Sequence, residues 1–229
     1  MQAPKRIVLA CVFLAGRVLA AEDAAQILKA TEQAYRSLTA YEFKGVTASE
    51  TKVGSTVSKT ETQFAVAFKQ PNEFRIEYDY PSAGEWIRAS DGKTFWNKRS
   101  ITKEFTEAPA TDDALRMLDG SPIAAFENLT QDLQNPKIAG SEAVTVGGQS
   151  YDCYVIEAAS NSVTASGPAR SVPVKLWIDK TRHLVLKQVS GSDDGPASAT
   201  SSENQRTLSF TEVLVNGSIP DDLFHVSKK

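Results

Sequence analysis

Hydrophobic and polar residues alternate with two different periods along this chain of 229 residues. Between positions 22 and 38, apolar residues recur every three or four positions, while Lys29, Glu32 and Arg36 lie largely on the opposite side. That spacing predicts an amphipathic helix near the N-terminus. From Tyr41 to about Thr106 the period falls to two, which predicts a series of half-buried strands.

Two neighbouring segments, 64–69 and 74–80, show the strand period most clearly. Alternation of this kind gives a strand one apolar face and one wet face, as in an antiparallel sheet. A Pro-Asn pair between the segments and Asp91-Gly92 after them are turn signals. The two strands therefore aim six large side chains at one face, namely Phe64, Val66, Phe68, Phe74, Ile76 and Tyr78.

The middle of the chain departs from the strand pattern. Residues 114–118 are apolar and helix-prone, and Ser121-Pro122 is typical of an N-cap followed by Pro at the first helical position. We therefore expect a helical insert. The segment that follows carries apolar residues at helical spacing: Ile123, Phe126, Leu129 and Leu133.

Segments rich in β-branched and aromatic residues resume after Pro136 and continue to about Gly217, which predicts further strands. Two linkers, 160–170 and 191–205, are rich in Ser, Gly and Ala and are typical of loops. The order is thus helix, β-meander, helical insert and second β-meander. It predicts the α+β class with an antiparallel sheet.

The predicted sheet is long, whereas the predicted helices are few. A curved antiparallel sheet with little cover closes on itself or keeps an apolar cavity. For any single apolar residue, a place in the ordinary core is the better interpretation. The functional hypothesis is that part of the concave face forms a lipid-sized groove, with residues 112–133 as its lid. The candidate ligand-binding residues are Phe64, Val66, Phe68, Phe74, Ile76, Tyr78, Trp96, Leu118 and Phe126.

The N-terminus has the pattern of an export signal. A basic start at Lys5-Arg6 precedes an apolar run over 7–16 that is too short to span a bilayer, and Val18-Leu19-Ala20 offers a cleavage site. We expect cleavage near Ala20 and one domain over residues 21–229. A lipoprotein signal ending at Cys11 is the alternative, but only four apolar residues precede that cysteine.

Cleavage would change both charge and cysteine content. It removes three of the 25 basic residues and none of the 28 acidic ones, which takes the net charge from −3 to −6. A net acidic chain without a basic patch argues against nucleic acid as a partner. Cys153 would remain as the single cysteine, so no internal disulfide is expected.

Trp177, Asp179 and His183 lie within seven positions and raise the question of a chemical site. A strand, a polar turn that begins at Asp179, and a second strand account for each of them without a ligand. Sequence motifs of serine hydrolases, zinc proteases, P-loop proteins and dinucleotide-binding folds do not occur. Cys153 lies in an apolar strand, where a thiol is usually inert. We expect no catalytic residue, no metal site and no cofactor.

Several short motifs, in order, resemble the LolA-like family of periplasmic lipoprotein carriers and related lipid-binding proteins. In the first half these are the Pro71-Asn72 turn, the Phe74–Glu77 strand, Pro81 and the Asp91–Trp96 hairpin. The second half adds "KLWIDKTRHLVLK" and a closing "FTEVLVNGSIPDDLFHV". The likeness spans nearly the whole chain after the signal.

The resemblance implies an unclosed antiparallel barrel around helices, with an apolar cavity that holds acyl chains of lipoproteins or lipids. The implied partners are such acyl chains and the lipoprotein-transfer proteins of the inner and outer membranes. Carriers of the family have an Arg before the Pro-Asn turn that helps to fasten the lid. This chain has Gln70 there, so a lid fastening of that kind is not expected.

The sequence therefore predicts a non-enzymatic, monomeric periplasmic carrier that binds acyl chains and transfers them between membranes. A cavity lined by apolar side chains recovers roughly 0.8 kcal/mol per CH₂ withdrawn from water. Two alternatives remain. One is an envelope-stress sensor, or another regulatory lipid-binding module, with the same fold. The other is an enzyme that acts on a lipid.

Overall fold

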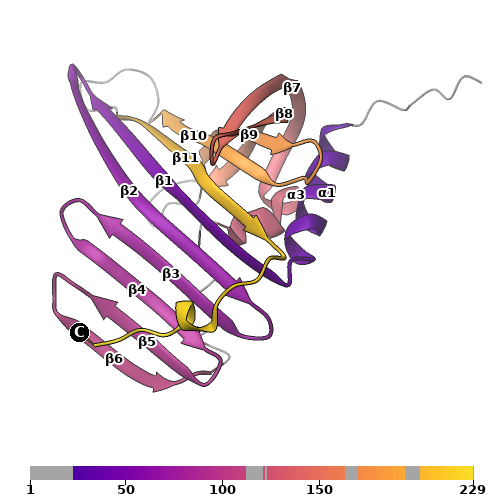
Figure 1. Cartoon of the computed structure of the whole chain (residues 1–229). Coiled ribbons are helices and arrows are strands. Elements are labelled where there is room, and N and C mark those ends of the chain that lie inside the picture. Colours follow the sequence, from indigo (N-terminus) through magenta and orange to yellow (C-terminus); the bar gives the residue numbers. More distant parts are fainter. Residues whose placement is uncertain (1–22, 112–120, 122, 163–169, 194–201, 229) are drawn as a thin grey trace, which may run out of the picture.

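The computed structural model describes residues 23–111, 121, 123–162, 170–193 and 202–228. Within them, eleven strands form one antiparallel sheet in the order β6-β5-β4-β3-β2-β1-β11-β10-β9-β8-β7 (Figure 1). The elements are α1 (Ala24–Arg36), β1 (Ala40–Val53), β2 (Thr56–Lys69), β3 (Glu73–Tyr80), β4 (Gly84–Asp91), β5 (Thr94–Arg99), β6 (Glu104–Pro109), η2 (Ala124–Glu127), α3 (Leu129–Asp132), β7 (Leu133–Val146), β8 (Gln149–Ser162), β9 (Arg170–Asp179), β10 (Val185–Asp193), β11 (Ser202–Val215) and η3 (Asp221–Phe224).

Helix α1 confirms the first sequence prediction. Asp23 caps its N-terminus, because its carboxylate accepts a hydrogen bond from the Gln26 amide at 2.8 Å. The apolar side chains predicted to share a face, among them Ile27 and Leu28, are fully buried. The helix covers one side of the sheet, which we call the inner face, and the opposite side is the outer face (Figure 1).

The strand register confirms that the six predicted side chains share the inner face. Phe64 pairs with Tyr78, Val66 with Ile76, and Phe68 with Phe74 across β2 and β3. Directly paired residues of antiparallel strands point to the same side of a sheet. All six belong to the main apolar cluster, together with residues of α1.

The sheet curves without closing, as expected. Strands β6 and β7 stand at its two ends and are not paired with each other. The β7–β8 hairpin turns back so far that the Gly147 amide donates a hydrogen bond to the Thr211 carbonyl oxygen of β11 at 3.0 Å. One half of the sheet is therefore strongly curled, while the half from β1 to β6 is more open (Figure 1).

The helical insert ends before Leu133, earlier than the sequence pattern predicted, and the helix-prone residues 114–118 lie outside the described residues. Its described part comprises Ser121, the four-residue η2 and the four-residue α3. Leu133, predicted to be helical, is the first residue of β7 and pairs with Ser160. A bulge in β7 accommodates Pro136, which has no amide to donate. Pairing with β8 therefore overrides the helical spacing.

The linkers are also shorter than predicted. Strand β8 runs to Ser162 and β9 begins at Arg170, while β10 runs to Asp193 and β11 begins at Ser202. Residues 163–169 and 194–201 lie outside the described residues, as does the predicted signal peptide. None of the helices in the described parts of the chain has the length and apolar character needed to cross a membrane.

The C-terminal segment after β11 crosses the outer face of β1 to β6 (Figure 1). Phe224 is fully buried against Ala40 and Ala67, and Val226 packs in a cluster with Ile87. The C-terminal segment thus covers part of the outer face in this half. Apolar side chains can be buried on the outer face as well as on the inner one.

Candidate functional site

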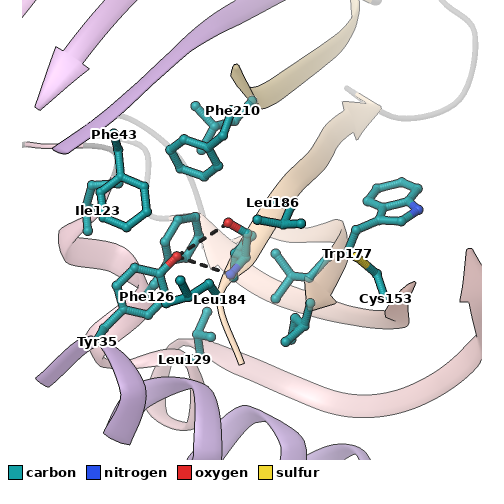
Figure 2. Close-up of a cluster of buried hydrophobic side chains, with 14 of the residues drawn as sticks. Tyr35, Phe43, Ile123, Phe126, Leu129, Cys153, Trp177, Leu184, Leu186 and Phe210 are labelled. Atoms are coloured by element: carbon teal, nitrogen blue, oxygen red, sulfur yellow. Dashed lines mark hydrogen bonds between the residues drawn. The ribbon is translucent and has the colours of Figure 1, made fainter. Parts of the chain in front are cut away.

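The inner face carries the largest apolar surface of the described residues, and the insert already covers it. Val66 and Phe74 are fully buried, and Phe64 and Ile76 nearly so. Figure 2 shows Phe126 of the insert pointing into this cluster between α1 and β11. Its ring centroid lies 5.3 Å from that of Tyr35 and 6.3 Å from that of Phe210. The insert therefore occupies the face with its own side chains.

A groove of about 640 Å³ remains beside the insert. It lies among the C-terminal end of α1, the start of β1, the end of β2 and the insert. Its volume falls in the range of small-molecule sites. Part of its lining is apolar, and the rings of Tyr41 and Phe68 in that part lie 5.4 Å apart. The rest of the lining is polar, so the groove is amphipathic. Its lining comprises Tyr35, Arg36, Leu38, Tyr41, Phe68, Gln70, Ser121, Ala124, Ala125, Glu127, Asn128 and Asp132.

Two residues of α1 fasten the insert. The buried Glu32 accepts hydrogen bonds at Oε1 from the Thr130 amide at 2.6 Å and from Thr130 Oγ1 at 2.7 Å. Arg36 Nη2 donates to the Glu127 carbonyl oxygen and to Asn128 Oδ1. These charge-assisted bonds satisfy groups at the ends of the two short helical turns. We call the contacts of Glu32 and Arg36 the α1 latch.

The α1 latch was not found by sequence reasoning. Gln70, which stands where carriers of the resembled family have an Arg, is exposed at the rim of the groove. The fastening charge lies instead on α1, where Glu32 and Arg36 share a side of the helix four positions apart. The spacing predicted that Glu32 lies on the polar side of the helix; this is wrong, because Glu32 is buried where the insert packs on α1. Its position four residues after the buried Leu28 was the available signal.

Tyrosine hydroxyls lie at the boundary between core and groove. Tyr35 Oη accepts a hydrogen bond from the Val185 amide at 3.1 Å and lies 3.4 Å from the Val185 carbonyl oxygen, to which it donates (Figure 2). Burial strongly raises the pKa of Tyr35. Burial also raises the pKa of Tyr41, and Glu127 adds to this shift by repelling a phenolate. Both tyrosine hydroxyls are therefore neutral and do not act as bases.

The structure brings together seven of the nine candidate residues. Phe64, Val66, Phe68, Phe74, Ile76, Tyr78 and Phe126 all belong to the inner-face cluster. Trp96 does not, contrary to expectation. It pairs with Ala89 and packs with Val226 on the outer face. Leu118 lies outside the described residues.

The Asp179–His183 segment is a tight turn between β9 and β10, as predicted. The Asp179 carboxylate accepts from the Thr181 and Arg182 amides and forms an ion pair with the Arg182 side chain. The His183 amide donates to the Asp179 carbonyl oxygen at 2.8 Å. His183 has a φ of 55°, a value that turns often require. These bonds hold the hairpin together and account for Asp179 without a ligand, whereas Nδ1 of His183 is buried with no hydrogen-bond partner among the described residues.

Metal-ligating side chains are scattered. Nowhere in the described part of the chain do three or more His, Cys, Asp or Glu residues gather as a metal site would require. A second, larger groove of about 1080 Å³ lies on the outer face beneath the C-terminal segment. Charged side chains such as Glu77 and Asp79 line much of it, which makes it a poor site for an acyl chain.

Neither the comparison with family models nor that with curated proteins finds a match. Solved structures with a similar chain path include LolA superfamily proteins and MucB. The Pseudomonas aeruginosa MucA/MucB complex is 15% identical with a TM-score of 0.46, and the match covers 89% of this chain and 61% of that chain. MucB alone is 15% identical with a TM-score of 0.49, and the match covers 89% of this chain and 62% of that chain. A LolA superfamily protein from Nitrosomonas europaea is 14% identical with a TM-score of 0.33, and the match covers 90% of this chain and 99% of that chain. Function has to be argued from the residues of this chain.

Proposed function

We propose that the protein is a non-enzymatic carrier that holds an acyl chain of a lipid or lipoprotein against the inner face of its sheet. The observation that carries the proposal is the amphipathic groove of about 640 Å³, which leads from the protein surface to the apolar cluster. Phe68 and Tyr41 belong to both the groove and the cluster, so a chain that enters the groove meets a continuous apolar surface.

The insert acts as the lid of this site. Its side chains fill the inner face when no chain is bound, and its described part contains only two helical turns. The α1 latch holds these turns with a few polar contacts at the rim of the groove. A lid held in this way can give way to a ligand that gains more from burial than the latch contributes.

The resulting cycle needs no bond chemistry. An acyl chain gains about 0.8 kcal/mol per CH₂ group that leaves water, while lifting the insert exposes Ile123 and Phe126. The two contributions oppose each other, so the bound state is stabilised only moderately. Moderate affinity is what a carrier requires, because it must also release its cargo. We place this cycle in the periplasm, since residues 1–20 have the pattern of a signal peptide.

A fluorescent fatty-acid binding assay tests the proposal. Phe68→Glu puts a carboxylate into the apolar side of the groove and should weaken probe binding about tenfold or more. Gln63→Glu is the matched control, since it places the same group on the exposed outer side of the same strand. Its affinity should stay within about twofold of the unaltered protein.

Failure of the unaltered protein to bind the probe would contradict the proposal, as would equal losses in the two variants. A regulatory lipid-binding module would use the same inner face, and the resemblance noted in the sequence also permits that role. Binding of an acyl chain is the step that both roles share. The assay therefore decides whether the inner face is a binding surface or an ordinary core.

A further inference from the structure

Charged residues are sorted between the two faces of the sheet. In the described register of β1 to β4 and β11, each Asp and Glu points to the outer face, as Glu77 and Asp79 do on β3. The inner-facing positions of these strands carry two charged residues, Arg88 on β4 and Arg206 on β11. The inner face is therefore apolar in its middle and cationic towards one end.

Arg88 is a half-buried cation whose neighbours are neutral or cationic. Its register partners are Ile76 on β3 and Asn97 on β5. Its guanidinium carbon lies 4.4 Å from the centre of the Trp86 ring. No ion pair between described residues includes Arg88. Burial lowers the pKa of Arg88, as expected of a cation that has lost water without gaining a carboxylate.

Arg206 reaches the same region from the other side of the curved sheet. Its register partners, Ser49 and Ser190, are neutral, and the ion pairs of the described residues do not include it. Arg206 and Tyr78 line one pocket of about 190 Å³, although β11 and β3 are separated by two strands in the sheet. Burial raises the pKa of Tyr78, and Arg88 and Arg206 both oppose this shift by favouring the phenolate.

The cationic end adjoins the apolar surface directly. Arg88 pairs with Ile76, Ile76 with Val66, and Val66 with Phe43, so one row across four strands runs from a guanidinium to the buried core. A ligand that matches this row has an acidic group at one end and an acyl chain at the other. Guanidinium groups bind phosphate and carboxylate with paired, charge-assisted hydrogen bonds.

We propose that Arg88 and Arg206 bind the acidic headgroup of an amphiphile whose acyl chain lies on the inner face, so that the protein selects anionic over neutral lipids. The proposal rests on the proposed function, because it names the class of ligand for that same face.

Two lysolipids with the same acyl chain separate headgroup from chain. Lysophosphatidic acid carries a net negative headgroup, and lysophosphatidylcholine carries a neutral one. Affinity is measured by displacement of a neutral fluorescent acyl probe at low salt. The unaltered protein should bind lysophosphatidic acid at least about tenfold more tightly than lysophosphatidylcholine. The preference should shrink as salt is added.

Removal of the two guanidinium groups should remove this preference. In Arg88→Gln/Arg206→Gln, the two lysolipids should bind within about twofold of each other, with binding of the neutral one unchanged. Lys52→Gln/Lys59→Gln is the matched control, because it deletes the same charge from exposed outer-face positions. It should keep the full preference. Arg206→Gln alone changes an exposed residue and provides a variant that should fold normally.

The outcomes distinguish the two proposals. Equal binding of both lysolipids by the unaltered protein would overturn the headgroup site and leave the carrier function intact. The headgroup site would also be overturned if the double Arg variant kept the preference or the Lys control lost it. Binding of neither lysolipid would remove both proposals. Inorganic phosphate should fail to displace lysophosphatidic acid. Displacement by phosphate at a concentration similar to that of the lysophosphatidic acid would show a phosphate site instead of a lipid site.

Discussion

At the scale of single residues, Asp179 illustrates how a chemical-looking constellation can be structural. Its carboxylate is 2% exposed, holds two turn amides and pairs with Arg182. Asp179→Ala should lower the free energy of unfolding by about 2–4 kcal/mol, because it leaves those amides without partners and removes the carboxylate that pairs with Arg182. Urea denaturation measures the change.

The same variant should bind the acyl probe as the unaltered protein does, since the turn is not part of the groove lining. His183→Ala is its companion. It retains the backbone hydrogen bond to Asp179. Alanine has a β-carbon, as histidine does, so the positive φ at this position is no more strained than before. Its stability should change by less than about 1 kcal/mol. Loss of binding at unchanged stability in either variant would restore a chemical role for the turn.

Cys153 provides a second prediction at this scale. The residue is fully buried, and burial raises the pKa of its thiol from 9.0 to about 11, with Asp179 and Asp152 adding repulsion. At pH 8 roughly one thiol in a thousand would be ionised in the folded chain. A thiol-reactive dye should therefore label Cys153 only when the protein unfolds.

The sign of the pH effect follows from the same shift. A raised pKa favours folding below the ordinary thiol value and loses that contribution as pH rises from 9.0 towards 11. Stability measured by urea should thus fall over that interval more in the unaltered protein than in Cys153→Ala. Fast labelling of the folded protein at pH 8 would show that the thiol is accessible after all.

At the scale of elements, the α1 latch can be separated from the helix that carries it. Glu32→Ala removes both bonds to Thr130 and should raise amide hydrogen exchange across residues 123–132 by about tenfold. Faster opening of the lid should also speed acyl-probe uptake. Mass spectrometry and stopped-flow fluorescence measure the two effects.

Two variants of α1 serve as controls for the latch. Glu32→Gln keeps an oxygen acceptor at the same place and should have a smaller effect. Lys29→Ala changes an exposed residue on the other side of the helix and should have none. Uniform acceleration of exchange over the whole chain in Glu32→Ala would mean that Glu32 supports the fold in general rather than the lid.

The elements also show how far sequence patterns reach. Alternation identified the inner-face set because wet residues stand between Phe74, Ile76 and Tyr78. The same alternation could not place Trp96, because the C-terminal segment makes the outer face of β4 and β5 apolar as well. Contacts between segments far apart in sequence decided that question. Leu133 changed from helix to strand for the same kind of reason.

At the scale of the whole molecule, the class and curvature of the sheet were predictable, whereas the content of the cavity was not. Hydrophobic spacing predicts which side chains are buried. It does not reveal that the insert buries them with Phe126, leaving a groove beside the latch. The approach of Arg206 to Tyr78 was equally hidden, since it depends on the curvature that brings β3 and β11 to one pocket.

If the insert and an acyl chain compete for the inner face, stability and affinity should respond to one change with opposite signs. Phe126→Ala should lower the free energy of unfolding by about 3–5 kcal/mol, because a buried ring is lost. It should also tighten acyl-probe binding, since less burial is given up when the lid opens. Each ~1.4 kcal/mol of that difference corresponds to tenfold in affinity.

Phe224→Ala is the matched control, as it deletes an equally buried ring on the outer face. It should destabilise the protein similarly and leave affinity unchanged. If Phe126→Ala instead binds more weakly while Phe224→Ala does not, the ring is part of the ligand's seat and the lid does not compete with the cargo.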